Sequence, residues 1–252
     1  VLFAEGFDEP PVVVMGPVSY NGTQPVTILI RSVTELGFEF QIREWDYLDG
    51  YHTLESVAYL AIEPGVWSMG GSVWEAGRSV PASSGTTASV SLQGSFSAAP
   101  VVVGQVEQDS TPYAVVPRVS SAGTSGFNFT LQQEEGASVV SQDNLATSLN
   151  WVAVSPATGT EAGINWESTV MPGITQNWTQ IDFQDGGAFP VVLAALQSVN
   201  ESDPATLRFR NLSSESIDVM VEEEKSLDSE VQHAGEDVGY LMLRKASPPV
   251  GN

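Results

Sequence analysis

The segment Pro11-Val12-Val13-Val14 decides the fold, because the chain contains it three times. It returns as Pro100-Val101-Val102-Val103 and again as Pro190-Val191-Val192-Leu193, at an almost constant interval. Self-similarity at a fixed period is the signature of a repeat architecture, so the chain is interpreted first as three copies of one unit.

Two further landmarks follow each proline in the same order. The first alternates apolar with polar residues and begins at Gly37, Gly126 and Ser216, at the same interval from the proline in every copy. The second is an apolar run, at positions 57–62, 149–154 and 238–243, whose aromatics are Tyr59, Trp151 and Tyr240. Its interval from the proline differs slightly between the copies, so only the loop before it varies in length.

Each copy has the pattern of a small antiparallel β-sandwich. Phe38-Glu39-Phe40-Gln41-Ile42 and Phe127-Asn128-Phe129-Thr130-Leu131 have the period of two that marks a strand with one wet face. Gly, Pro, Asn and Ser separate the runs, and no stretch keeps a helical period beyond about two turns. We therefore expect an all-β protein with about five or six short strands in each copy.

The last strand of each copy is apolar on both faces, which is typical of a strand that is covered on both sides. One interpretation is that the three final strands pack against each other at the centre of an intrachain pseudo-trimer. The alternative is a central strand covered by a long loop. The expected modules are residues 1–68, 69–160 and 161–252, and the connectors between them carry large aromatics that favour docking. These aromatics are Trp67, Trp74, Trp166 and Trp178.

Composition excludes several classes of protein. Among 252 residues, nine are Lys or Arg and 31 are Asp or Glu, for a formal net charge of −22. Nucleic acids and anionic membranes require a basic face, so neither is an expected partner. The chain has no cysteine, which excludes disulfides, thiol nucleophiles and thiolate metal sites. No apolar run reaches transmembrane length and no signal peptide opens the chain, so we expect a mature extracellular segment.

The first copy resembles the H-type lectin domain. The resemblance rests on Phe7 and Pro10-Pro11, on Gly37-Phe38, on Trp45-Asp46 and on the final strand with Tyr59. It covers all of copy one, less of copy three, and least of copy two. It implies a six-stranded sandwich, trimeric assembly and binding of galactose-type sugars. Because the family builds its trimer from separate chains, three copies in one chain imply a covalent trimer that is monomeric in solution.

The resemblance also implies a sugar site on a loop at one end of each sandwich, here residues 44–55, 133–147 and 223–236. The first of these loops gathers aromatic rings for stacking and polar groups for hydroxyls. The alternative is that the aromatics fill the base of the module while the acids are solvated. The expected sugar contacts are Trp45, Asp46, Tyr47, Asp49, His52, His233 and Glu236, with Tyr51 crowding the same loop.

The two histidines occupy matching positions, in His52-Thr53-Leu54-Glu55 and His233-Ala234-Gly235-Glu236. A His–Glu hydrogen bond that fixes the loop is the favoured interpretation, with a sugar contact or a metal pair as alternatives. Copy two has Asn144 and Thr147 at these positions. Two ligands are too few for a zinc site, which normally needs three or four.

Acidic clusters allow Ca²⁺ as a cofactor, although no EF-hand spacing is present and no cofactor is otherwise expected. The clusters lie at Glu222-Glu223-Glu224, Asp228 to Glu230, Glu236-Asp237 and Asp182 to Asp185. No phosphate loop, catalytic triad or zinc-protease motif occurs. The expected function is non-catalytic carbohydrate binding outside the cell, with a polysaccharide as partner. The alternatives are a structural or adhesive stalk and a polysaccharide-degrading enzyme.

Overall fold

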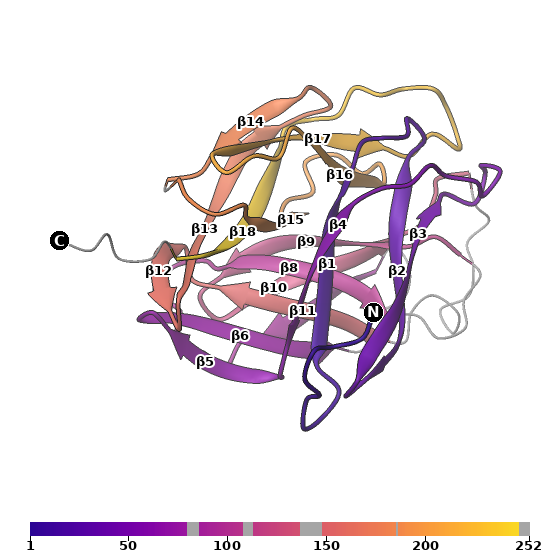
Figure 1. Cartoon of the computed structure of the whole chain (residues 1–252). Helices are drawn as coiled ribbons and strands as arrows, with labels where there is room; N and C mark the ends of the chain where they lie inside the picture. Colours follow the sequence, from indigo (N-terminus) through magenta and orange to yellow (C-terminus); the bar gives the residue numbers. More distant parts are fainter. Residues whose placement is uncertain (80–85, 108–112, 137–147, 185, 247–252) are drawn as a thin grey trace.

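The computed structural model describes residues 1–79, 86–107, 113–136, 148–184 and 186–246, and the described part is all-β (Figure 1). It holds 18 strands and no helix, which confirms the expected fold class. Accordingly, no helix in the described part is long and apolar enough to cross a membrane.

Each copy contributes four strands, three of which lie at the repeated landmarks of the sequence. Copy one forms β1 (Val12–Ser19), β2 (Val26–Thr34), β3 (Gly37–Glu44) and β4 (Val57–Ile62). Copy two forms β8 (Val101–Glu107), β9 (Val116–Gly123), β10 (Gly126–Gln132) and β11 (Ser148–Val154). Copy three forms β15 (Val191–Leu196), β16 (Ala205–Arg210), β17 (Ser216–Glu223) and β18 (Glu236–Lys245).

The connectors between the copies are themselves strands. The first forms β5 (Gly65–Met69), β6 (Ser72–Ser79) and β7 (Thr87–Ser91), and the second forms β12 (Ala157–Glu161), β13 (Ile164–Ile174) and β14 (Thr179–Asp182). The expected boundaries at residues 68/69 and 160/161 fall inside β5 and β12. Each connector begins as a hairpin after one copy and joins the sheets of the next, so the connectors do not divide the chain into separate pieces.

Copies two and three each form two layers. In copy two, β6, β11 and β8 pair in one layer and β7, β10 and β9 in the other. In copy three, the layers are β13–β18–β15 and β14–β17–β16. Apolar side chains fill the space between the layers, as in any face-to-face sandwich. Copy one has β4 beside β1 and β3 beside β2, with Leu2 bridging to Gly37.

Hydrogen-bonded sheets continue from one copy to the next. β2 lies parallel to β8 at Ile30 and Glu107, and β16 lies parallel to β1 at Val18 and Arg208. A six-stranded sheet therefore runs through copies one and two, and a five-stranded sheet through copies three and one. Figure 1 shows β1, β8 and β11 near the middle of the molecule.

The packing of the final strands explains why they are apolar on both faces. Leu60, Val152 and Leu241 belong to one central apolar cluster, together with residues of β1, β8 and β15. The alternate residues face the other way: Tyr59 contacts Phe38, Trp151 contacts Phe127 and Tyr240 contacts Phe183. The aromatics of the final strands are therefore outside the central apolar cluster. Because side chains alternate along a strand, each aromatic enters its own sandwich and its neighbour enters the shared cluster.

A substitution in the central cluster should destabilise the whole chain. Leu193 is fully buried there, so we expect Leu193→Ala to lower the free energy of unfolding by about 2–5 kcal/mol. Leu227→Ala is the control, since Leu227 is 67% exposed. Denaturant unfolding of both variants measures the difference, and equal stability of the two would contradict a shared central core.

Candidate functional site at the boundaries between copies

The two histidines are held in the same way by carboxylates of their own copy. His52 has its Nδ1 3.2 Å from Glu44 Oε1 and its Nε2 3.0 Å from Glu55 Oε1. Glu44 ends β3, and Glu55 lies just before β4, so the histidine ties the intervening loop to the sandwich. Both ring nitrogens are engaged, and the side chain is almost fully buried. This geometry matches the loop-fixing interpretation of the histidine.

An arginine of another copy completes this arrangement. The Nη2 of Arg208, in β16 of copy three, lies 2.9 Å from Glu55 Oε1. The same guanidinium pairs with Glu222 at 2.5 Å and donates to the backbone oxygen of Ser19. We call Glu44, His52, Glu55, Arg208 and Glu222 the first ionic cluster. It connects copy three to copy one.

A second ionic cluster, formed by Glu223, His233, Glu236 and Arg118, connects copy two to copy three. His233 lies 3.2 Å from both Glu223 Oε1 and Glu236 Oε1. Arg118, in β9 of copy two, donates to Glu236 Oε1 at 2.8 Å. The arginine, the histidine and Glu236 are each at most 4% exposed.

The hydrogen bonds that Glu55 and Glu236 accept from the surrounding loop are also alike in the two copies. Glu55 accepts the backbone N–H groups of Asn21 and Gly22, and Glu236 accepts those of Asn200 and Glu201. The hydroxyls of Ser19 and Ser198 donate to the same two carboxylates. Each carboxylate is thus saturated with donors, which is how proteins stabilise a buried negative charge.

The boundary between copies one and two is different. Counted from the proline of each copy, Leu29 takes the position that Arg118 and Arg208 hold in the other copies, and Gln133 stands in place of Glu44. Asn144 and Thr147 lie outside the described residues. The described hydrogen bonds across this boundary include Gln105 Nε2 donating to the backbone oxygen of Ile28 at 2.9 Å and the N–H of Ala114 donating to Asp46 Oδ2 at 2.9 Å.

Burial and the ionic partners shift the pKa values in opposite directions. Burial alone would raise the pKa of Glu236, but hydrogen bonds from His233 and Ser198 and the charge of Arg118 lower it to about 2. Burial opposes the protonation of His233, yet its hydrogen bonds to Glu236 and Glu223 raise its pKa above the usual value. Burial raises the pKa of Glu222 to about 7, with Arg208 acting in the opposite direction.

The remaining residues expected to contact sugar are divided between core and surface. Trp45 is 1% exposed and packs with Ala114 and Val116, so it offers no ring face to a ligand. Its alternative role, filling the base of the module, fits this position. Asp46 pairs with Arg43 and accepts the N–H of Ala114.

Tyr47, Asp49 and Tyr51 lie nearer to solvent. Tyr47 is 37% exposed, and burial together with the charge of Glu224 raises its pKa to about 12. Asp49 accepts the N–H of Tyr51, whose ring is 84% exposed. The structure does not bring these side chains together with His233 and Glu236, which belong to the cluster between copies two and three.

Sequence reasoning missed both arginines. Arg118 follows Pro100 at the same interval at which Arg208 follows Pro190, and an arginine repeated at one position was the signal that could have revealed them. Nine basic residues stand against 31 acidic ones in this chain, so a basic residue kept in two copies at one position points to a specific carboxylate partner.

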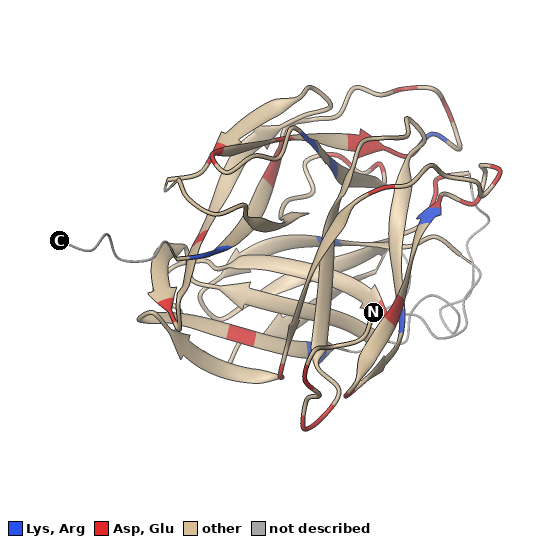
Figure 2. Ribbon diagram, viewed as in Figure 1, with Lys and Arg blue, Asp and Glu red and all other residues tan. Residues whose placement is uncertain are grey.

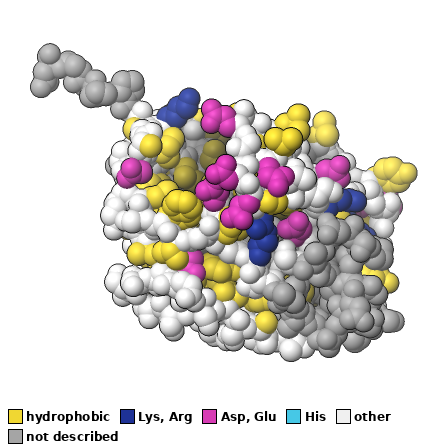
Figure 3. All heavy atoms as spheres, turned by 90° about the horizontal axis from the view of Figure 1, so that it is seen from below, with side chains coloured by type: hydrophobic (Ala, Val, Ile, Leu, Met, Phe, Trp, Pro, Cys, Tyr) yellow, Lys and Arg dark blue, Asp and Glu magenta, His cyan; other side chains and the backbone are white. Residues whose placement is uncertain are grey.

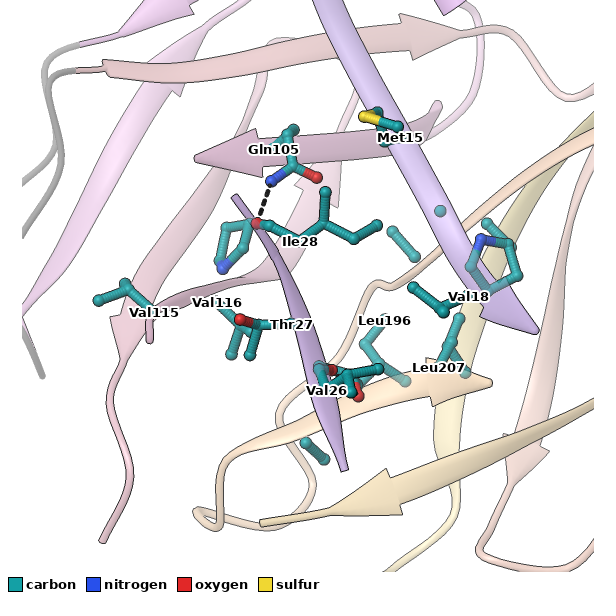
Figure 4. A pocket seen from close by; sticks show the side chains of 17 residues that line it. Met15, Val18, Val26, Thr27, Ile28, Gln105, Val115, Val116, Leu196 and Leu207 are labelled. Atoms are coloured by element: carbon teal, nitrogen blue, oxygen red, sulfur yellow. Dashed lines mark hydrogen bonds between the residues drawn. The ribbon is translucent and has the colours of Figure 1, made fainter. Parts of the chain in front are cut away.

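A small cavity lies where the three copies meet (Figure 4). Its volume is about 80 Å³, well below the roughly 300–1,000 Å³ of ordinary ligand pockets. Its lining is apolar apart from a few groups such as Gln105 and Thr27. A wider groove of about 590 Å³ has no aromatic residue in its lining, which includes Ser120, Ser121, Gln197, Asn200 and Asp237. Neither space combines a ring platform with polar groups.

One set of side chains in the described part could hold a metal ion. Glu201, Glu223 and His233 bring possible ligand atoms within 4.8 Å of one another. Three such ligands fall short of the six to eight oxygens that Ca²⁺ takes. The imidazole is also already engaged by Glu223 and Glu236, so a metal would compete with the second ionic cluster.

No family model and no solved structure matches the chain. The chain is 22% identical over 253 residues to Halomucin of Haloquadratum walsbyi. This match covers 96% of the chain, and therefore all three copies, but the chain spans only about 3% of the length of that relative.

Removing the arginine of the first ionic cluster should leave two carboxylates buried without their cation. We expect Arg208→Ala to lower the free energy of unfolding by about 3–5 kcal/mol. Arg31→Ala is the matched control, because Arg31 makes only an exposed hydrogen bond to Gln41. Denaturant unfolding compares the two variants, and a loss no larger than that of the control would show that the cluster does not hold copies one and three together.

Stability should fall in acid because of Glu236. A carboxyl whose pKa is about 2 in the folded chain, against 4.5 as its ordinary value, stabilises the fold above pH 4.5. That contribution is lost as the pH falls from 4.5 towards 2. We therefore expect the stability difference between the wild type and Glu236→Gln to shrink across this range, measured by urea unfolding. The exposed variant Glu230→Gln serves as control, and a difference independent of pH would contradict the assignment.

Proposed function

We propose that this chain is a structural building block of an extracellular protein, in which three H-type-lectin-like sandwiches form an intrachain pseudo-trimer. The packing between copies supports this arrangement because it is cyclic. β1 packs against β11, β8 against β18 and β15 against β4, so each copy contacts the next and the third contacts the first. In a stalk of modules placed end to end, the third copy would not contact the first.

The structural role is supported most directly by the position of the polar loop residues. His52, His233 and Glu236, chosen from the sequence as sugar contacts, are buried in the two ionic clusters between copies. A group that already satisfies its partners in the folded chain must break those bonds before it can bind a ligand. The burial of these residues supports a role of the loops in assembly.

The charge distribution supports a location outside the cell. Acidic residues are spread over the loops and strands, while basic ones are few (Figure 2). Seen from below, both acidic and hydrophobic side chains reach the surface (Figure 3). A net charge far from zero keeps a protein soluble and separate from its neighbours, which suits an exposed repeat in a long chain. The similarity to Halomucin across the whole chain supports the same proposal.

Sugar binding stays a prediction of the sequence resemblance. It would now have to use Tyr47, Tyr51 and Asp49 without Trp45, since the indole is buried. These three side chains are fewer than the aromatic platform and polar set from which the lectin hypothesis started.

Two measurements on the whole chain test the proposal. We expect a single calorimetric transition whose van't Hoff enthalpy equals the calorimetric enthalpy, because copies that share one core unfold together. We also expect no binding on a glycan array, with or without EDTA. Separate transitions for the three copies would contradict the pseudo-trimer. Binding to galactose-type sugars that Tyr51→Ala abolishes would instead establish the lectin function.

A further inference from the structure

The last strand of copy one lacks a neighbour that the equivalent strands have. β11 lies between β8 and β6, and β18 lies between β15 and β13, whereas β4 pairs with β1 alone in the described part of the chain. The consequence is visible in exposure: Tyr59 is 39% exposed, but the equivalent Trp151 and Tyr240 are 5% and 3% exposed. An edge strand with free backbone groups is a template for another strand.

The strands that cover β11 and β18 share one sequence feature. β6 carries Trp74-Glu75 and β13 carries Trp166-Glu167, and they pair in the same register. Each tryptophan lies opposite the third residue after the aromatic of the last strand, Val154 or Leu243. In β4 the corresponding residue is Ile62.

The glutamate of each pair binds the turn that opens the same copy. Glu75 accepts the backbone N–H groups of Gln93 and Gly94 at 2.9–3.0 Å. Glu167 accepts the N–H of Gln184 at 2.8 Å and also the hydroxyl of Tyr240. The glutamate therefore fastens the added strand to the opening turn and, in copy three, to the aromatic of the last strand.

Copy one contains the same turn. Phe3 N donates to Leu36 O at 2.9 Å, as Leu92 N donates to Ser125 O and Phe183 N to Glu215 O. The next two residues, Ala4 and Glu5, correspond to Gln93 and Gly94. They are exposed, and no described group accepts their N–H protons. Nor does any described group accept the hydroxyl proton of Tyr59.

The packing of the two tryptophans also indicates where a third tryptophan would fit. The rings of Trp74 and Trp166 meet edge to face, 5.3 Å apart, inside the central apolar cluster. Leu60 and Ile62 of β4 border the same cluster and are only half-buried. A tryptophan opposite Ile62 would cover this remaining side.

We propose that the free edge of β4 binds a third Trp-Glu strand, antiparallel to β4, supplied by a further repeat of this kind in the same polypeptide. Its glutamate accepts the N–H groups of Ala4 and Glu5, and its tryptophan lies opposite Ile62. The inference does not depend on whether the chain binds sugar.

The connections inside the chain favour this source. Glu75 precedes its partner Gln93 by 18 positions, and Glu167 precedes its partner Gln184 by 17. Each Trp-Glu strand therefore reaches the last strand of its copy from a segment joined directly ahead of the opening turn. A strand joined ahead of Phe3 by a similar length of chain reaches the edge of β4 in the same way.

The test is to graft the chain's own hairpin onto the full chain. Residues 157–180 are copied directly ahead of Val1, which puts Val1 where Ile181 follows Gln180 and keeps the spacing to Phe3. We expect the amide protons of β4 that do not pair with β1 to exchange on the order of tenfold more slowly. We also expect Tyr59 to become protected from chemical modification and the midpoint of thermal unfolding to rise.

The matched control is the same graft with Trp166→Ala and Glu167→Gln in the copied segment only. It keeps the length and the hairpin, so any protection of β4 that came only from crowding would remain in this control. We expect it to leave β4 exchange as in the ungrafted chain. Equal protection by both grafts, or by neither, would overturn the proposal. So would a dimer of the ungrafted chain in sedimentation with β4 already protected, since a second copy of the chain would then be the occupant.

Discussion

In each ionic cluster, a buried arginine of one copy pairs with a glutamate of another copy. Arg208 is fully buried in copy three, and one of its two carboxylate partners, Glu55, belongs to copy one. Arg118 is fully buried in copy two, and Glu236 belongs to copy three. Separating the copies would take these partners away, so the ionic clusters fix which copy meets which. The apolar cluster stabilises the contact between the copies, and the arginines determine how the copies are positioned relative to each other.

Burial removes both basic and acidic residues from solvent. Arg118, Arg208 and Arg244 are at most 3% exposed, and seven glutamates are at most 5% exposed. Arginine suits this buried position because its planar fork can satisfy several oxygens at once, as Arg208 does with Glu55, Glu222 and the backbone of Ser19.

The strands at the repeated landmarks could be predicted because each depends on local pattern, although copy one forms four strands instead of the expected five or six. The alternation in β3 and β10 and the doubly apolar β4, β11 and β18 follow from which faces are buried. The candidate site could not be predicted as well, because the same residue types serve two purposes. A tryptophan beside an aspartate suits a sugar platform, but Trp45 is packed under Ala114 and Val116 of copy two, which no local pattern reveals. The arginines were missed because their partners are 118 and 153 residues away along the chain.

The three copies hold their last strand by two devices, and each copy has at least one of them. Copy one has the ionic cluster in the loop before β4, but no Trp-Glu strand beside β4 among the described residues. Copy two has the Trp-Glu strand β6, while Leu29 takes the place of the arginine that would face its loop. Copy three has both. Both devices saturate a glutamate with backbone N–H donors of a neighbouring turn, one from the loop before the last strand and one from the strand beside it. Because both devices hold the same strand, a copy that lacks one of them still has its last strand tied to a neighbouring turn by the other.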